Sequence, residues 1–194
     1  MDYKPTQSIL PVDMDIYYPD NGVCLLVEYI LEHGFRQRFK RGATIVCEGD
    51  SSEMLYLIRR GAVKCVTKDY RGHERIIALM FENEFVGSYI PSRLNYTSPF
   101  GVVTLEECLL YSISIPRHQD FFEREIDGQR YVRFFTEHIA HTHLRHYLSQ
   151  ITQSPWQRLE DLLQRVPNLM QRISQRDIAA YIGVSPEVLS RHKQ

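Results

Sequence analysis

Three side chains near the end of the chain have the chemistry and the spacing to contact DNA bases. Glu187, Ser190 and Arg191 occupy positions i, i+3 and i+4 of a predicted helix, so they share one face. In a major groove, a guanidinium donates to guanine O6 and N7, and a carboxylate accepts from cytosine N4. The pattern therefore favours a base-contacting helix. The alternative is the solvated polar face of a helix in a small bundle.

The residues before this face predict a second helix and a tight turn. In the stretch ISQRDIAAYIGVSPEVLSRHKQ, Ser174 and Asp177 form a variant of the capping box, and Gly183 permits the turn. Ser185 caps the next helix, and Pro186 is tolerated at its first position. Val188 and Leu189 are expected to face the core. The DNA contacts predicted on this helix pair are Ser174, Gln175, Ser185, Glu187, Ser190, Arg191 and Lys193.

Other reactive side chains do not form a catalytic or metal-binding pattern. His138 with His141, and His143 with His146, have a spacing that a metal site can use, but no third ligand stands nearby. The four cysteines are far apart and form no C-x-x-C pair. Nucleophile-elbow and P-loop patterns are absent. The sequence predicts no metal, no cofactor and no enzyme. The alternative is a β-roll that binds small ligands or acts as a metal enzyme, with structural terminal helices.

Composition and charge describe an ordinary globular chain. Its 194 residues are 43% hydrophobic and 24% charged, with a net charge of −1 at pH 7. A net charge near zero excludes nucleic-acid binding through bulk positive charge, so any DNA contact must be local. The start, MDYKPTQS, lacks the pattern of a secretory signal, and the apolar run GVCLLVEYIL is broken by Glu28. We expect a cytoplasmic protein with no membrane span.

The sequence texture changes along the chain and predicts the order of elements. Residues 1–22 contain three prolines and predict an irregular lead-in, and residues 23–33 predict a short helix. Residues 35–115 contain short β-branched and aromatic runs separated by glycines, which predict an antiparallel roll. The Ser154-Pro155 pair then begins a helix that Pro167 ends.

A long helix is predicted over residues 121–151, with apolar residues on more than one face. An adjoining stripe holds Leu144, Leu148 and Ile151. Two apolar stripes predict that the helix packs both on its own roll and on a second chain, and the first stripe is the expected dimer seam. The alternative is a helix that lies wholly against its own roll. The predicted seam consists of Val132, Phe135, Ile139 and Thr142.

The stretch GATIVCEGDSSEMLYLIRRGAVKC resembles the cyclic-nucleotide-binding roll of the Crp/Fnr family of bacterial transcription regulators. The order of roll, long helix and helix-turn-helix is also that of the family. The resemblance implies an α+β protein with an antiparallel β jelly-roll sensor domain, a long dimerisation helix and a C-terminal helix-turn-helix domain. The matching residues are Gly49, Asp50, Tyr56, Ile58, Gly61 and Val63.

The family resemblance also implies an organisation and a set of partners. The chain would divide into a lead-in (1–22), a β-roll (23–122), a dimerisation helix (123–152) and a helix-turn-helix domain (153–194). It would act as a homodimer on double-stranded DNA with an inverted-repeat site, and it would contact RNA polymerase. The pattern Glu187-x-x-Ser190-Arg191 resembles the Fnr-like branch, which implies half-sites similar to TTGA.

The residues expected for cyclic AMP are missing. Members that bind it carry Gly-Glu-Leu and, further along, Arg-Ser or Arg-Thr, whereas here Ser88 follows Gly87 and Ser98-Pro99 replaces the arginine pair. Loss of that arginine removes a charge-assisted hydrogen bond of about 1.5–3 kcal/mol. We therefore expect no cyclic AMP binding, and the effector, where one exists, is another small molecule. The candidate pocket residues are Gly87, Ser88, Arg93 and Ser98.

Overall fold

The computed structural model describes residues 22–51, 53–87 and 97–192. Its strands are β1 (Phe35–Phe39), β2 (Thr44–Val46), β3 (Met54–Arg60), β4 (Val63–Lys68), β5 (Glu74–Met80), β6 (Phe85–Gly87), β7 (Gly101–Thr104) and β8 (Cys108–Ser114). They form two four-stranded sheets, with the orders β1-β8-β3-β6 and β2-β7-β4-β5. Every paired register is antiparallel. The predicted antiparallel sheet core is confirmed.

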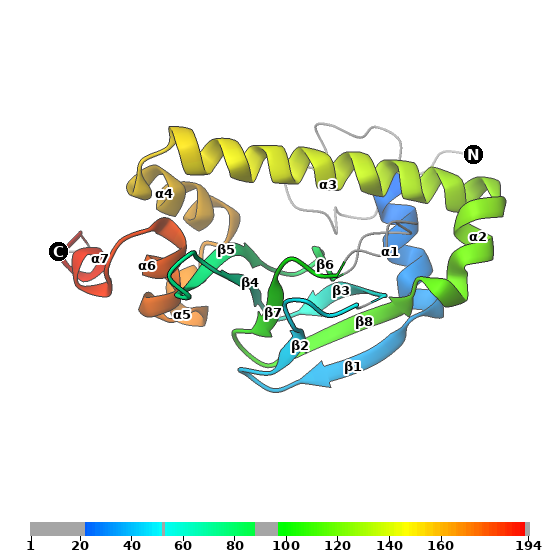
Figure 1. Cartoon of the computed structure of the whole chain (residues 1–194), viewed down its shortest axis with the longest axis horizontal. Helices are drawn as coiled ribbons and strands as arrows, with labels where there is room; N and C mark the ends of the chain where they lie inside the picture. Colours follow the sequence, from blue (N-terminus) through cyan, green and yellow to red (C-terminus); the bar gives the residue numbers. More distant parts are fainter. Residues whose placement is uncertain (1–21, 52, 88–96, 193–194) are drawn as a thin grey trace.

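Helices precede and follow the roll. They are α1 (Gly22–His33), a 3-10 turn (Pro116–His118), α2 (Gln119–Arg124), α3 (Ile126–Thr152), α4 (Pro155–Arg165), α5 (Leu169–Arg172), α6 (Gln175–Ile182) and α7 (Pro186–His192). Figure 1 shows α3 running along the length of the molecule, with α4–α7 gathered at its C-terminal end beside β4 and β5. Within the described ranges, no helix has the length and apolar character needed to cross a bilayer.

The helix predicted over residues 121–151 is divided in two. Glu125 has an extended backbone, with ψ 140°, so α2 ends there and α3 begins at the next residue. The two helices approach closely at Gly128, where an added Cβ would lie 2.1 Å from the carbonyl oxygen of Phe121. Only a glycine allows this approach. The break lets Phe122 enter the core, where its side chain is 2% exposed.

Three groups of buried side chains hold these layers together. One lies between the two sheets and includes Ile58 and Val102. A second lies between β3, β8 and the helices α1–α3, and includes Leu57 and Phe135. The third joins the roll to the C-terminal helices. Its members from the roll are Ala62, Ile76, Leu79, Phe81 and Leu105, and they pack with Leu159, Leu162, Val166, Leu169, Ile173, Ile178, Ala179, Ile182 and Leu189.

Candidate functional site

The helices α6 and α7 are positioned by the caps that the sequence predicts. The hydroxyl of Ser174 accepts from the backbone N–H of Asp177 at 3.1 Å, and Ser185 accepts from Val188 at 3.4 Å. Gly183 joins the helices with φ 82°, in the left-handed region that glycine adopts without strain. Arg158 of α4 donates to the carbonyl of Ile182 at 2.6 Å, which satisfies an acceptor at the end of α6.

The face predicted to contact bases is exposed. Glu187, Ser190 and Arg191 all lie on the surface of α7, while Leu189 is fully buried. Val188 was expected in the core, but it is 41% exposed because α7 has only one buried row over α6. A hydrogen bond from Ser185, its own backbone N–H and the charge of Arg191 lower the pKa of Glu187. Its carboxylate is therefore ionised and can accept hydrogen bonds.

The other residues predicted to contact DNA differ in their exposure. Gln175 and Ser185 are exposed, whereas Ser174 is half-buried and donates its hydroxyl to the carboxylate of Asp177. Lys193 lies outside the described residues. The structure thus brings the helix starts and the exposed α7 face to one end of the molecule (Figure 1).

Ion pairs connect these helices to the roll, and no local sequence pattern predicts them. In the first pair, Nζ of Lys64 in β4 lies 3.3 Å from Oδ1 of Asp177 in α6. In the second, Nη2 of Arg165 in α4 lies 3.3 Å from Oε1 of Glu84. Arg172 of α5 reaches Glu82 at 2.7 Å and also pairs with Glu106. We call these contacts the roll–helix ion pairs: Lys64–Asp177, Arg165–Glu84, Arg172–Glu82 and Arg172–Glu106.

The carboxylates of the roll–helix ion pairs differ in electrostatic environment. Burial raises the pKa of Glu84, and the opposing charge of Arg165 does not fully offset this effect. Burial alone would also raise the pKa of Glu82, but hydrogen bonds from Arg172 and from the N–H of Gly61 lower it overall. The pair of Glu82 with Arg172 is therefore a stronger ionic contact than the pair of Glu84 with Arg165.

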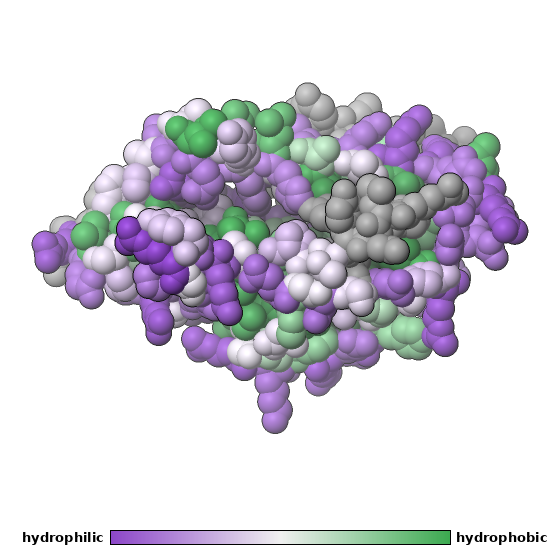
Figure 2. Space-filling view, viewed as in Figure 1, coloured by the Kyte–Doolittle hydropathy of each residue, from purple (hydrophilic) through white to green (hydrophobic). Residues whose placement is uncertain are grey.

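A cavity of about 430 Å³ lies between α3 and the strands. Figure 2 shows the surface hollowed beneath α3, with apolar side chains at the bottom of the hollow. Among the described residues that line the cavity, none is Asp, Glu, Lys or Arg. The lining consists of Leu55, Cys65, Ile77, Ala78, Met80, Phe85, Val86, Gly87, Pro99, Phe100, Phe135, Ile139, Thr142, His143 and His146.

The predicted pocket residues meet this cavity only in part. Gly87 lines it, and Pro99 and Phe100 also contribute. Ser98 does not, because its hydroxyl donates to the carbonyl of Phe100 at 2.6 Å and its backbone pairs with Gly49 and Asp50. Ser88 and Arg93 lie outside the described residues.

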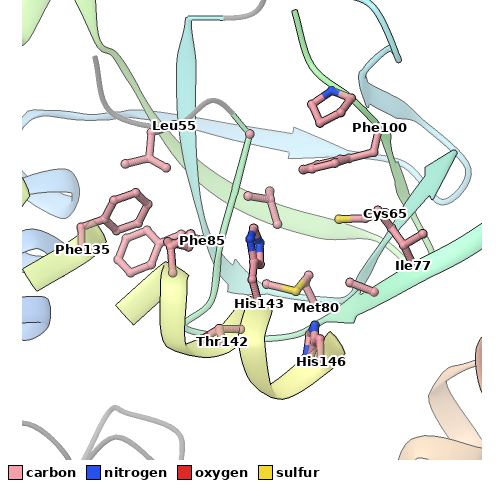
Figure 3. Close-up of a pocket in the computed structure, with 15 residues that line it drawn as sticks. Leu55, Cys65, Ile77, Met80, Phe85, Phe100, Phe135, Thr142, His143 and His146 are labelled. Carbon is pink, nitrogen blue, oxygen red and sulfur yellow. The ribbon is translucent and has the colours of Figure 1, made fainter. Parts of the chain in front are cut away.

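Two histidines of α3 were missed as cavity residues. His143 and His146 both line the cavity, and Figure 3 shows them on the α3 wall, facing the strands. Burial lowers the pKa of His143, and it lowers the pKa of His146 to about 4 with help from Arg165, Arg145 and His143. The signal was present in the sequence, because Ile139, His143 and His146 follow the period of one helix face.

The stripe predicted as the dimer seam faces the chain's own roll. Phe135 is 3% exposed, Val132 and Ile139 pack against the same core, and Thr142 lines the cavity. Val132, Ile139 and Thr142 are half-buried, so the roll covers this stripe only in part. The adjoining stripe is the exposed one. It holds Leu144 (55%), Tyr147 (62%), Leu148 (44%) and Ile151 (60%).

Metal-ligating groups do not converge within the described part of the chain. No group of three or more His, Cys, Asp or Glu side chains there has the geometry to hold a metal ion. Cys65 and Cys108 are buried, and burial raises the pKa of their thiols to about 12 and about 11. At neutral pH both are therefore protonated and behave as core side chains.

The roll is similar to a known family of domains. Residues 36–125 match the cyclic nucleotide-binding domain family. A stretch of 61 residues is 30% identical to the cAMP-activated global transcriptional regulator CRP of Salmonella typhimurium and of Escherichia coli O157:H7. That match covers 31% of this chain and only 29% of those proteins.

Two solved structures resemble the chain over most of its length. FixK2 from Bradyrhizobium japonicum is 16% identical, with a TM-score of 0.70 over 81% of each chain. The c-di-GMP responsive global regulator CLP from Xanthomonas campestris is 22% identical, with a TM-score of 0.63 over 89% of each chain. At such identities the likeness shows the fold alone, namely an antiparallel β core with helices.

The buried imidazole of His146 predicts a pH dependence of stability. In the unfolded chain it takes up a proton below its ordinary pKa of 6.5, but in the folded chain only near pH 4. The free energy of unfolding is therefore expected to fall as pH drops from about 6.5 towards about 4. His146→Phe should flatten this fall, measured as thermal midpoints across that range. The control His141→Phe, at an exposed position of α3, should leave it steep, and equal slopes for both variants would contradict the assignment.

Proposed function

We propose that the chain is a dimeric, sequence-specific DNA-binding transcription regulator of the Crp/Fnr type, and not an enzyme. The observation that supports this most is the exposed face of Glu187, Ser190 and Arg191 on a capped helix pair. This pair is attached to a roll that matches the cyclic nucleotide-binding domain family. In this proposal residues 23–122 form the sensor, 123–152 the dimerisation helix and 153–194 the helix-turn-helix domain.

The partners follow from this function. A two-fold dimer requires an inverted repeat whose half-sites lie about 34–36 Å apart, one helical turn of DNA. The resemblance to the Fnr-like branch suggests half-sites similar to TTGA. RNA polymerase is the further partner that a transcription regulator needs. The dimer seam that we now propose is the exposed stripe of Leu144, Tyr147, Leu148 and Ile151, since the first stripe faces the roll.

The residues of α7 have separate roles in the proposed complex. Arg191 donates to O6 and N7 of the guanine in the half-site, as a forked guanidinium can. Glu187 accepts from N4 of the paired or adjacent cytosine, and Ser190 contacts the neighbouring thymine. Ser174, Gln175, Ser185 and Lys193 position the helices on the phosphate backbone.

Binding-site selection from random DNA tests the proposal. The unaltered protein should select an inverted repeat and should lose affinity as salt increases. Arg191→Ala should cost about 1–3 kcal/mol per half-site and relax the preference at the guanine. Arg124→Ala is the matched control, because it removes one positive charge from an exposed position on α2, at the far end from α7.

Two outcomes would refute the assignment. A selected site without a dyad, or an Arg191 variant that still requires the same guanine, would show that α7 does not contact bases as proposed. Absence of any sequence-specific, salt-sensitive retention would instead favour the alternative, a ligand-binding roll whose terminal helices are structural.

A further inference from the structure

The lining of the cavity under α3 restricts the kind of molecule that it can hold. Its volume of about 430 Å³ is in the range of small-molecule sites. The described lining is aliphatic and aromatic on the strand side, with Leu55, Ile77 and Phe85, and it contains no charged residue. A phosphate or carboxylate would lose its hydration there without gaining an ionic partner from this lining. The described part of the lining therefore favours an uncharged molecule.

One polar atom on the α3 wall lacks a hydrogen-bond partner in the described part of the chain. Nε2 of His146 is buried and has no hydrogen-bond partner among the described residues. The side chain of His146 borders the cavity one turn beyond Thr142 (Figure 3). A buried polar atom without a partner is costly, so a ligand group that bonds to it gains affinity. A neutral imidazole can accept or donate at Nε2, depending on its tautomer.

We propose that the cavity between α3 and the strands binds an uncharged, largely apolar small molecule that forms one hydrogen bond with Nε2 of His146. This molecule is the effector of the proposed regulator, so its regulatory role rests on the proposed function. The binding of this molecule does not depend on the proposed function, because the cavity is formed without DNA.

The position of the cavity fits an effector site. Met80, Phe85 and Val86 line it, while Phe81 and Glu82 on the same short segment contact the C-terminal helices. A bound molecule that displaces the cavity-lining side chains therefore also displaces the backbone that carries Phe81 and Glu82.

Fluorescence titration with N-phenyl-1-naphthylamine tests the ligand class. This probe is uncharged and aromatic, and its single N–H matches an acceptor at Nε2. We expect saturable enhancement with the unaltered protein and no displacement by excess cyclic AMP or cyclic di-GMP. Thr142→Phe should remove saturable binding, because the larger ring occupies the cavity. His146→Phe keeps an aromatic ring but removes the nitrogen, and it should weaken binding about three- to tenfold, the worth of one neutral hydrogen bond.

Controls keep each outcome decisive. His141→Phe, at an exposed position of the same helix, should bind the probe as the unaltered protein does. Thermal unfolding of every variant separates lost binding from lost folding, and His146→Phe serves as the test if Thr142→Phe does not fold. Absence of saturable binding, displacement by cyclic AMP, or equal affinity of the His146 and His141 variants would overturn the proposal. Failed titration with intact DNA binding would refute the ligand class alone, whereas intact titration without specific DNA binding would refute the proposed function alone.

Discussion

Arg172→Ala is expected to lower the free energy of unfolding by about 2–4 kcal/mol. The Arg172 side chain is 19% exposed and lies between Glu82 and Glu106, which are 34% and 29% exposed. Removing it leaves two partly buried carboxylates without a cation. The guanidinium also lies over the ring of Phe81 at 5.6 Å, and this contact is lost as well. Urea denaturation at neutral pH measures the change.

The exposed pair of Arg124 with Asp120 supplies the control for the Arg172 variant. These side chains are 77% and 83% exposed, so Arg124→Ala should cost no more than about 0.5 kcal/mol. The pH dependence gives a second criterion. Because the pKa of Glu82 is lowered from 4.5, its pairing stabilises the fold above about pH 4.5 and is lost as pH falls through the lowered value. Arg172→Ala should therefore also weaken the loss of stability in acid. Equal unfolding energies for the two alanine variants would contradict this account.

The consequence of the Arg172 contact extends beyond stability. Phe81 lies beneath two guanidinium groups, those of Arg165 at 5.8 Å and Arg172 at 5.6 Å. Its neighbour Met80 lines the cavity, and so does Phe85, five residues after Met80. A single turn, with Asn83 at φ 67°, thus connects the cavity wall to the anchors of α4 and α5. The roll–helix ion pairs therefore connect the roll and the C-terminal helices at this turn.

Features that depend on neighbouring residues were predictable from the sequence. Ser154 forms a full capping box with Gln157, Ser174 caps α6, and Gly183 has the left-handed backbone that the turn requires. Each of these depends on side chains within four positions, so the local sequence contains the necessary information. The strands β1 to β8 lie within residues 35–115, where the sequence predicts a roll, since their β-branched and aromatic composition is also local.

Features that depend on distant contacts were not predictable. The helix α3 has two apolar stripes, and the choice of the stripe that faces the roll is set by its rotation against Phe85 and the other core residues. The roll–helix ion pairs join residues 66 to 113 positions apart, for which no local pattern exists. The short strand β6 and the helix α5 have three and four residues, too few to show a period.

Leu148→Asp is expected to convert the proposed dimer to monomers. In the exposed stripe, Leu144, Leu148 and Ile151 recur at steps of four and three along the C-terminal half of α3, and Figure 2 shows apolar side chains gathered there at the upper left. In the N-terminal half, the outward positions after the first turn include the charged residues Arg133 and Glu137. We therefore place the proposed seam between two copies in the C-terminal half. Aspartates meeting across it would be desolvated and would repel each other, at a cost of several kcal/mol.

Sedimentation velocity over a range of concentrations measures this dissociation. Ile126→Asp is the matched control, because it makes the same kind of substitution at a 76% exposed position in the first turn of the same helix. That variant should remain dimeric and bind the inverted repeat normally. The Leu148 monomer should still fold but should lose affinity for the inverted repeat, since each copy then reaches only one half-site. A dimer that survives Leu148→Asp and dissociates with Ile126→Asp would place the seam at the opposite end of α3.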